Sequence, residues 1–359
     1  MAGVEITAPP MPNMPDSTPV ATPTTRVTAI STHSGTAGTV VASDRLSRER
    51  APVSGYAHCV SSDLDLHGVW VPLVTPFDAQ GAVDVDAIER LCHEYAAAGV
   101  SGIVALGTTG EASALEADEK QTVIDTIVRA CSTTSARVIV GTGSNSTAAT
   151  VRATAALADV PGVVGALVVV PYYVRPSIDG IVAHMRAVAA ASPVPVILYN
   201  VPTRTGRDLG ADGLLELASV PNIAGVKQAV ATLDTDTLRL LAEAPEGFAV
   251  LGGEDTLLFP LMCMGAVGTI SAAAHLCTER FVAMIECGLA GKIEDGRAHA
   301  EALLPVIRAG YVHPNPAVFK GVLHAQGRIP TPDVRLPLTN APAAAVGRCL
   351  DAVAAASHP

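Results

Sequence analysis

Short, continuous runs of Val, Ile, Leu and Ala recur along the chain from about residue 66 onward. Most of these runs lack polar alternation, which is typical of parallel strands covered on both faces. They recur at spacings of roughly 25 to 35 residues, which leaves room for a helix and two loops between strands. The eight predicted strands are 69–73, 102–106, 137–140, 165–170, 194–199, 223–227, 248–251 and 267–270.

Helical periodicity fills the intervals between these strands. In segment 84–98 apolar residues recur every three or four positions, at Val85, Ile88, Leu91 and Tyr95. Segment 117–131 repeats the pattern. Eight strand–helix units predict an α/β fold, a closed (β/α)₈ barrel. The rival fold, an open doubly wound sheet, normally carries a Gly-rich phosphate-binding turn after its first strand, and none follows residue 73 here.

Composition divides the chain into three parts. Residues 1–65 are rich in Ser, Thr and Pro and have no periodic apolar face, so we expect a disordered extension without a targeting role. Residues 66–275 hold the eight predicted strands and form the predicted catalytic barrel. Residues 276–359 give further helical periodicity and are predicted to be a C-terminal helical region.

Charge and composition exclude several classes of protein. The chain has 34 acidic and 23 basic residues, and this excess of acid argues against a nucleic-acid partner. No apolar run approaches the ~18 residues of a membrane span. The seven cysteines are scattered and form no Cys-x-x-Cys pair, so we expect free thiols and a cytoplasmic location. No His pair or acidic cluster has ligand spacing, so no metal is expected.

A lysine closes the sixth predicted strand. In a (β/α)₈ barrel the C-terminal ends of the strands carry the chemistry, so Lys227 is expected to point into the barrel mouth. An amine removed from water loses its preference for the charged form and becomes a nucleophile. The chain keeps only four lysines, at 120, 227, 292 and 320, which favours a functional Lys227 over an ordinary surface lysine.

Other strand ends carry groups that suit the same chemistry. Tyr199 ends the fifth strand and could move protons beside an amine, and Arg204 follows it with a planar fork for a carboxylate. The Gly-flanked turn 107–111 after the second strand offers backbone N–H groups for a small anion. Two adjacent tyrosines, Tyr172 and Tyr173, follow the fourth strand. Together these groups predict Schiff-base chemistry on a 2-oxo acid.

Four ordered motifs carry a resemblance to a known family. They are Gly-Thr-Thr-Gly-Glu at 107–111, Pro-Tyr-Tyr-Val-Arg-Pro at 171–176, Tyr-Asn-Val-Pro-Thr-Arg-Thr-Gly at 199–206 and Gly-Val-Lys at 225–227. Over about residues 67–340 the chain resembles the dihydrodipicolinate synthase and N-acetylneuraminate lyase family of class I aldolases. The resemblance implies a (β/α)₈ barrel with extra C-terminal helices, a homotetramer built from tight dimers, and no cofactor beyond a covalent imine.

The resemblance also implies roles for individual residues. Lys227 would form the imine with pyruvate, and Tyr199 would relay protons. Thr108 would link Tyr199 by hydrogen bonds to Tyr173, which in the family reaches across from the neighbouring subunit. The implied substrate-binding residues are Thr109 for the pyruvate carboxylate, Arg204 for the carboxylate of the second substrate, and Gly253 and Ile270 in the pyruvate pocket.

The motifs favour the synthase branch of the family. That branch condenses pyruvate with L-aspartate 4-semialdehyde to 4-hydroxy-tetrahydrodipicolinate in the diaminopimelate route to lysine. Two departures, Gln228 in place of an acid after the lysine and the pair Glu254-Asp255, leave open an alternative: a pyruvate-dependent aldolase or dehydratase of sugar acids. A third hypothesis is a non-catalytic binding barrel. It conflicts with the joint presence of four catalytic candidates, Lys227, Tyr199, Thr108 and Tyr173.

Some members of the resembled family are inhibited by lysine, bound near the first tyrosine of the pair, here Tyr172. In those members a glutamate stands four residues beyond an asparagine after the third strand. This chain keeps Asn145 but has Ala149 at the glutamate position. Ala117 and Lys120 replace two histidines of the cleft, and a second cation repels a cationic ligand. We therefore expect weak lysine binding.

Overall fold

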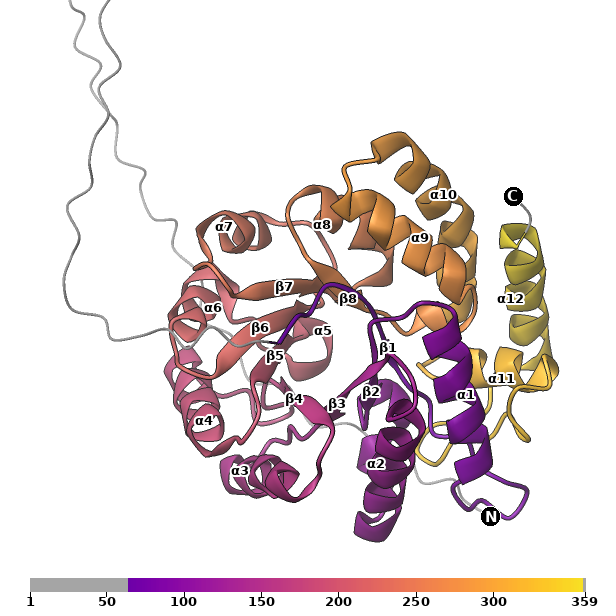
Figure 1. Ribbon diagram of the computed structural model, residues 1–359, viewed down its shortest axis with the longest axis horizontal. Coiled ribbons are helices and arrows are strands. Elements are labelled where there is room, and N and C mark those ends of the chain that lie inside the picture. The colour runs from indigo at the N-terminus through magenta and orange to yellow at the C-terminus, as the bar shows by residue number, and fades with distance from the viewer. Residues whose placement is uncertain (1–63, 358–359) are drawn as a thin grey trace, which may run out of the picture. The chain divides into compact units, whose positions relative to one another are not determined.

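The computed structural model describes residues 64–357, so nearly all of the expected extension at 1–65 lies outside the described residues. Eight parallel strands close into a barrel in chain order, and β8 pairs back to β1 (Figure 1). This confirms the predicted (β/α)₈ fold. The strands are β1 (Gly68–Pro72), β2 (Gly102–Ala105), β3 (Arg137–Gly141), β4 (Val163–Val169), β5 (Val196–Asn200), β6 (Ile223–Gln228), β7 (Ala249–Gly252) and β8 (Gly268–Ile270).

Helices alternate with the strands and cover the outside of the barrel (Figure 1). Those up to β8 are α1 (Val85–Ala97), α2 (Ala117–Cys131), α3 (Thr147–Ala155), α4 (Ile178–Ala191), α5 (Pro202–Thr205), α6 (Gly210–Ala218), α7 (Thr235–Glu243) and α8 (Leu258–Cys263). After β8 come α9 (Thr278–Leu289), α10 (Ile293–Gly310), α11 (Ala317–Ala325) and α12 (Ala343–Ala356). The expected C-terminal helices are thus present, and α9 packs against β1.

Each predicted strand differs from the structure by one or two residues at one or both ends, and two of these differences have clear local reasons. The fifth strand begins at Val196, two residues later than predicted, directly after Pro195, which has no backbone N–H to give to a neighbour. The second strand ends at Ala105 because Leu106 adopts a left-handed conformation with φ of 55°. This conformation is costly for a branched residue and turns the chain toward the barrel mouth.

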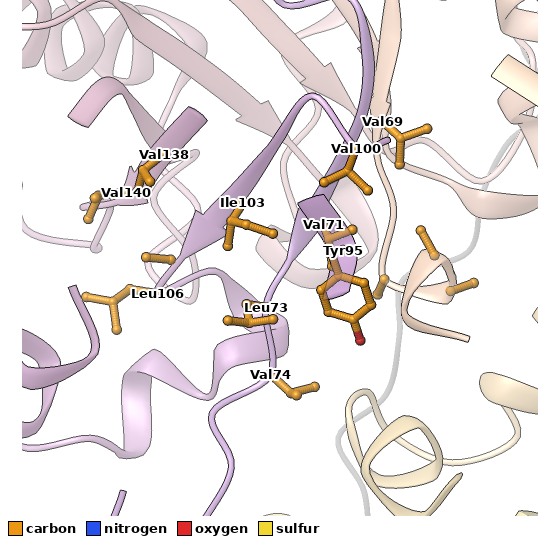
Figure 2. Packing of buried hydrophobic residues seen from close by; sticks show 14 of the residues in the cluster. Val69, Val71, Leu73, Val74, Tyr95, Val100, Ile103, Leu106, Val138 and Val140 are labelled. Atoms are coloured by element: carbon orange, nitrogen blue, oxygen red, sulfur yellow. The ribbon is translucent and has the colours of Figure 1, made fainter. Parts of the chain in front are cut away.

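The strands separate two apolar layers. Val69 and Val71, which face outward on β1, and Leu73 just after it pack against the inner face of α1, where Tyr95 is fully buried (Figure 2). Inward residues of seven of the eight strands, together with Ala229 just after β6, form the apolar layer inside the barrel. This alternation follows from the two-residue period of a strand.

Trp70 anchors the inner layer. Its side chain is fully buried, and its indole N–H donates to the carbonyl of Leu66 at 3.2 Å. Gly102, its register partner on β2, makes room for the ring, since a Cβ there would lie 2.3 Å from Trp70 Cζ3. The guanidinium of Arg137 lies 5.1 Å from the ring centroid.

A buried ion pair ties α11 to the loop after β2. Lys320 Nζ donates to Glu111 Oε1 at 2.9 Å and to the carbonyl of Thr75 at 2.8 Å, and both charged side chains are almost wholly buried. The second oxygen of Glu111 accepts the backbone N–H of Arg335 at 2.7 Å. The C-terminal segment therefore holds the Gly-Thr-Thr-Gly-Glu loop in place.

Candidate active site

A cavity of ≈ 380 Å³ opens at the C-terminal ends of the strands. Its wall takes residues from the strands β1, β4, β5, β6 and β8, from the loops after β2, β5, β6, β7 and β8, and from the end of α10. Seven of the eight residues predicted from the sequence as a site line this one cavity. They are Thr108, Thr109, Tyr199, Arg204, Lys227, Gly253 and Ile270.

Lys227 and Tyr199 stand side by side on adjacent strands. They are register partners across β5 and β6, and both occupy inward positions. The Lys227 side chain is 7% exposed, and its Nζ lies 4.3 Å from the centroid of the Tyr199 ring. The ring face stabilises a positive charge on this nitrogen. The arrangement places an amine and a proton-transfer group side by side in a part of the cavity wall that is largely shielded from water.

Gly253 makes the space in which the lysine stem lies. A Cβ at this position would come within 2.9 Å of both Cγ and Cε of Lys227 and 2.8 Å of Ala229 Cβ. Such contacts are shorter than carbon atoms tolerate, so any side chain here would displace the amine. The backbone N–H of Gly253 donates to the Gln228 carbonyl at 2.8 Å, which fixes the loop beside β6.

The loop after β2 forms one end of the cavity. The left-handed turn at Leu106 leads into Gly107 and the short 3₁₀ helix η1 (Thr108–Gly110), and Glu111 is again left-handed with φ of 55°. Thr109 is buried, and its hydroxyl accepts a hydrogen bond from Asn315 Nδ2 at 2.9 Å. The Oδ1 atom of Asn315 is buried without a protein partner. The Thr109 hydroxyl accepts from Asn315 and can donate its own proton to a small carboxylate.

The loops after β4 and β5 are joined to each other. Arg175 Nε donates to the Gly206 carbonyl at 3.2 Å, and Arg207 Nε donates to the Arg175 carbonyl at 3.0 Å. Arg204, in α5, is exposed at the cavity rim, and no carboxylate among the described residues pairs with it. A free guanidinium at a cavity rim can receive a substrate carboxylate.

Tyr173 is the predicted site residue that does not line the cavity. Its side chain is 87% exposed, and its backbone is left-handed with φ of 70°. Thr108 lines the cavity, but no hydrogen bond joins its hydroxyl to Tyr199 or to Tyr173 in this single chain. The expected relay of these three residues is therefore not assembled within one protomer.

Gln228, the departure next to the lysine, lies outside the cavity. Its Oε1 accepts from Asn200 Nδ2 at 2.9 Å, and its Nε2 donates to Thr237 at 3.1 Å. Because successive strand residues point to opposite faces, the residue after an inward lysine faces the helix layer. An amide there satisfies a buried network and does not touch the site.

Sequence reasoning missed the cavity wall contributed by the end of α10. Arg308 and Tyr311 line the cavity, and the Tyr311 hydroxyl donates to buried Asp255 at 2.8 Å. The sequence held one signal, a tyrosine four positions before Asn315 in a chain with 3% aromatic residues. Helical periodicity does not reveal which end of a late helix reaches the barrel mouth.

Residues 64–357 contain neither a candidate metal site nor a candidate membrane span. Within this range no three His, Cys, Asp or Glu side chains gather in a metal-binding cluster. No helix in the same range has the length and apolarity to cross a membrane.

Comparison with known proteins agrees with the geometry. A family model described as the dihydrodipicolinate synthetase family matches residues 65–353. A 4-hydroxy-tetrahydrodipicolinate synthase from Moorella thermoacetica is 41% identical over 269 residues, covering 75% of this chain and 91% of the relative.

Solved structures show the same similarity. The chloride-inhibited dihydrodipicolinate synthase from Acinetobacter baumannii, in complex with pyruvate, is 34% identical with a TM-score of 0.78, over 81% of this chain and 99% of that one. The enzyme from Cyanidioschyzon merolae with lysine bound is 36% identical with a TM-score of 0.77, over 81% and 98%. The resemblance seen in the motifs is thus confirmed, and the chain belongs to the dihydrodipicolinate synthetase family of lyase-type enzymes.

Proposed function

We propose that the protein condenses pyruvate with L-aspartate 4-semialdehyde to give 4-hydroxy-tetrahydrodipicolinate. The observation that carries the proposal is the amine of Lys227 beside the Tyr199 ring, in a cavity whose other end offers polar groups for a carboxylate. The relatives with this named activity are matched over about nine-tenths of their length, which supports the same reaction here.

The chemistry runs through an imine. The Lys227 amine adds to C2 of pyruvate, and the C2 oxygen leaves as water after taking up two protons, one of them delivered through Tyr199. Loss of a proton from C3 gives an enamine, whose C3 attacks the aldehyde carbon while the aldehyde oxygen takes up a proton. The amine of the joined product then adds to C2, closes the ring and releases Lys227.

Binding groups orient the two substrates. The Thr109 end of the cavity would hold the pyruvate carboxylate so that C2 faces Lys227, while Gly253 and Ile270 line the pocket around it. Arg204 at the rim would receive the carboxylate of the aldehyde. The pyruvate complex of the Acinetobacter baumannii relative supports this choice of first substrate. No cofactor enters the proposed reaction.

The exposed Tyr173 would complete the relay in a neighbouring copy. Its exposed ring next to exposed Val174 suits an interface, and we propose a homotetramer in which Tyr173 of one protomer approaches Thr108 of its partner.

Tyr173→Phe should then lower kcat while sedimentation still reports the tetramer. A monomer with full activity would contradict this part of the proposal.

Borohydride trapping tests the function. Reduction in the presence of labelled pyruvate should add a three-carbon acid to Lys227 alone, and Lys227→Ala should lose the adduct and nearly all turnover. Lys292→Ala, which alters an exposed lysine, is the matched control and should keep both. Label on Lys120, Lys292 or Lys320 contradicts the assignment. Turnover of a sugar acid and not of aspartate semialdehyde would favour the alternative aldolase.

A further inference from the structure

A carboxylate without a cationic partner is buried behind the cavity wall. Asp255 begins the short helix η4 (Asp255–Leu257), two residues after Gly253, and its side chain is almost wholly buried. No ion pair among the described residues includes it. Burying a lone carboxylate is costly, so its retention requires compensation from its surroundings.

Hydrogen bonds satisfy only one of its two oxygens. Asp255 Oδ2 accepts the backbone N–H of Ala273 at 2.9 Å and the hydroxyl of Tyr311 at 2.8 Å. The other oxygen, Oδ1, is buried without a protein partner. Capping of the three-residue helix η5 (Ala273–His275) explains the bond from Ala273, but it explains neither the Tyr311 bond nor the free oxygen.

Tyr311 connects this carboxylate to the cavity. It follows α10, lines the cavity, and packs its ring edge-on against Phe319 with centroids 5.2 Å apart. Its side chain is 41% exposed, yet its hydroxyl is directed to the buried oxygen of Asp255. The side chain thus reaches from the open cavity to the buried acid.

Charged groups around the pair come from several segments. Lys227 on β6 lies next to the segment that carries Asp255, since a Cβ at Gly253, two residues before it, would stand 2.9 Å from Lys227 Cε. The charge of Lys227 favours the ionised form of Asp255, while Tyr199 on β5 and Glu254 raise the pKa of Tyr311. Burial raises the pKa of Asp255, and the bonds from Ala273 and Tyr311, the nearby Ser271 side chain and the charge of Lys227 partly oppose this. Burial and the neighbouring carboxylate raise the pKa of Tyr311, so its hydroxyl stays protonated and donates.

We propose that Asp255 and Tyr311 are a pair of positioning residues, in which the carboxylate held by Tyr311 supplies the counter-charge for the protonated imine at Lys227. A fixed negative charge in a desolvated wall stabilises a cation that forms during the reaction. The inference rests on the proposed imine. It adds an electrostatic role for two residues outside the eight that the sequence predicted.

The test compares pH–rate profiles of Tyr311→Phe and Tyr95→Phe. The first variant removes only the hydroxyl and keeps the ring on Phe319. The second variant is the matched control. It removes a tyrosine hydroxyl that does not line the cavity and that donates to the His275 carbonyl with a distance of 3.3 Å. Without its donor Asp255 holds a proton more strongly, so the acid limb of the kcat profile should move to higher pH in Tyr311→Phe alone.

The magnitudes are specific. For Tyr311→Phe we expect kcat at neutral pH to fall about tenfold, equal to ~1.4 kcal/mol, with the KM for pyruvate within about twofold. Asp255→Asn should remove that acid limb and lower kcat further, and Tyr311→Phe carries the test should the Asn variant not fold. A Tyr311→Phe profile that superimposes on the parent profile overturns the inference. Failure of the parent enzyme to trap pyruvate overturns the proposed function instead.

Discussion

A lysine side chain reaches the centre of a barrel only where its neighbours are small. The stem of Lys227 lies against Gly253, where an added Cβ would collide with both Lys227 and Ala229. The position of the amine beside Tyr199 therefore depends both on its contact with the ring and on the lack of a side chain at position 253. Placement of the nucleophile is thus sensitive to single carbon atoms.

Gly253→Ala should displace Lys227, because the new Cβ would lie 2.9 Å from its Cε. We expect kcat/KM for pyruvate to fall about 100-fold, as misplacement of a reacting group by ~1 Å can cost this much. Borohydride trapping should slow in parallel. Steady-state kinetics with a trapping time course checks this.

Gly347→Ala is the matched control for that substitution. Gly347 lies within α12 and nothing stands within 4 Å of its added Cβ. The free energy of unfolding should rise by about 0.5–1 kcal/mol, because alanine favours a helix over glycine, and activity should stay unchanged. Equal losses of activity in both variants would show that position 253 is not special.

At the level of residues the sequence predicted the groups on the strands and missed those on late helices. Tyr199 and Lys227 were predictable because a continuous apolar run defines a strand, and its last inward residue must face the barrel mouth. Asp255 and Tyr311 meet only because α10 packs back over the barrel, and no local pattern encodes that approach. The sequence predicts Leu106 as part of the second strand because the residue is apolar, and its apolar character gives no sign of the left-handed backbone that it adopts.

At the scale of elements, two buried polar contacts join parts of the fold that are distant in sequence. Lys320 of α11 pairs with Glu111 after β2, and the backbone N–H of Val74 donates to His275 Nε2 at 3.2 Å, joining the end of β1 to the segment after β8. Both contacts flank the cavity from outside. These contacts determine the positions of two loops, which the helical periodicity of the sequence does not predict.

Lys320→Met should destabilise the fold by about 3–5 kcal/mol, because Glu111 would remain buried without its cation. Lys292→Met, at an exposed lysine, should change the free energy of unfolding by less than about 0.5 kcal/mol. Chemical denaturation measures both. The double variant Glu111→Gln with Lys320→Met should be more stable than Lys320→Met alone, and a further loss would contradict the buried-charge explanation.

Acid should weaken the fold through His275. Burial is the main cause that lowers the pKa of this imidazole, to about 3, and Val74 requires its Nε2 to be unprotonated. Above the unfolded value of ~6.5 both states are neutral, so His275 contributes no pH dependence there. As the pH falls from 6.5 toward 3, only the unfolded chain takes up the proton, and stability should fall by up to ~1.4 kcal/mol per pH unit.

Denaturant titrations at pH 7, 6 and 5 check this slope. Burial also lowers the pKa of His184, which adds a loss of the same sign. His275→Gln should therefore reduce the slope without abolishing it, while His93→Gln, at an exposed histidine, should leave it unchanged. A slope that is identical in all three proteins would exclude His275 as the cause.

At the scale of the whole molecule, membership of the family determines the barrel fold, whereas inhibition by lysine depends on a few individual positions. Asn145 precedes α3, and Ala149 lies in its first turn, where the Ser146 hydroxyl accepts its N–H at 3.4 Å. A glutamate side chain is therefore absent from that turn, and Lys120 in α2 adds a positive charge. These positions differ from the lysine-sensitive pattern that the resemblance implies.

Lysine at 1 mM should leave the rate of this protein essentially unchanged. Calorimetry should detect no binding with a Kd below about 1 mM, which corresponds to ~4 kcal/mol. The Cyanidioschyzon merolae relative, solved with lysine bound, is the positive control. Half-inhibition below about 1 mM would mean that other side chains rebuild the cleft.

Removal of residues 1–60 should leave activity and Tm nearly unchanged. The family match begins at residue 65, and the barrel closes through β1, which starts at Gly68. Activity assays and thermal scans of the shortened and full chains compare the two. A drop of more than about 5 °C, on the order of 1 kcal/mol or more, would show that the segment contributes to the fold.

The single tryptophan gives this barrel an intrinsic optical reporter. Trp70 is paired in register with Gly102 on one side and Ile270 on the other, at the seam where the last strand meets the first. Its indole is fully buried and lies beneath the Arg137 guanidinium, so water reaches the ring only when the seam opens. A red shift of its fluorescence would therefore report opening of the β1–β8 seam, without a label and independently of turnover at Lys227.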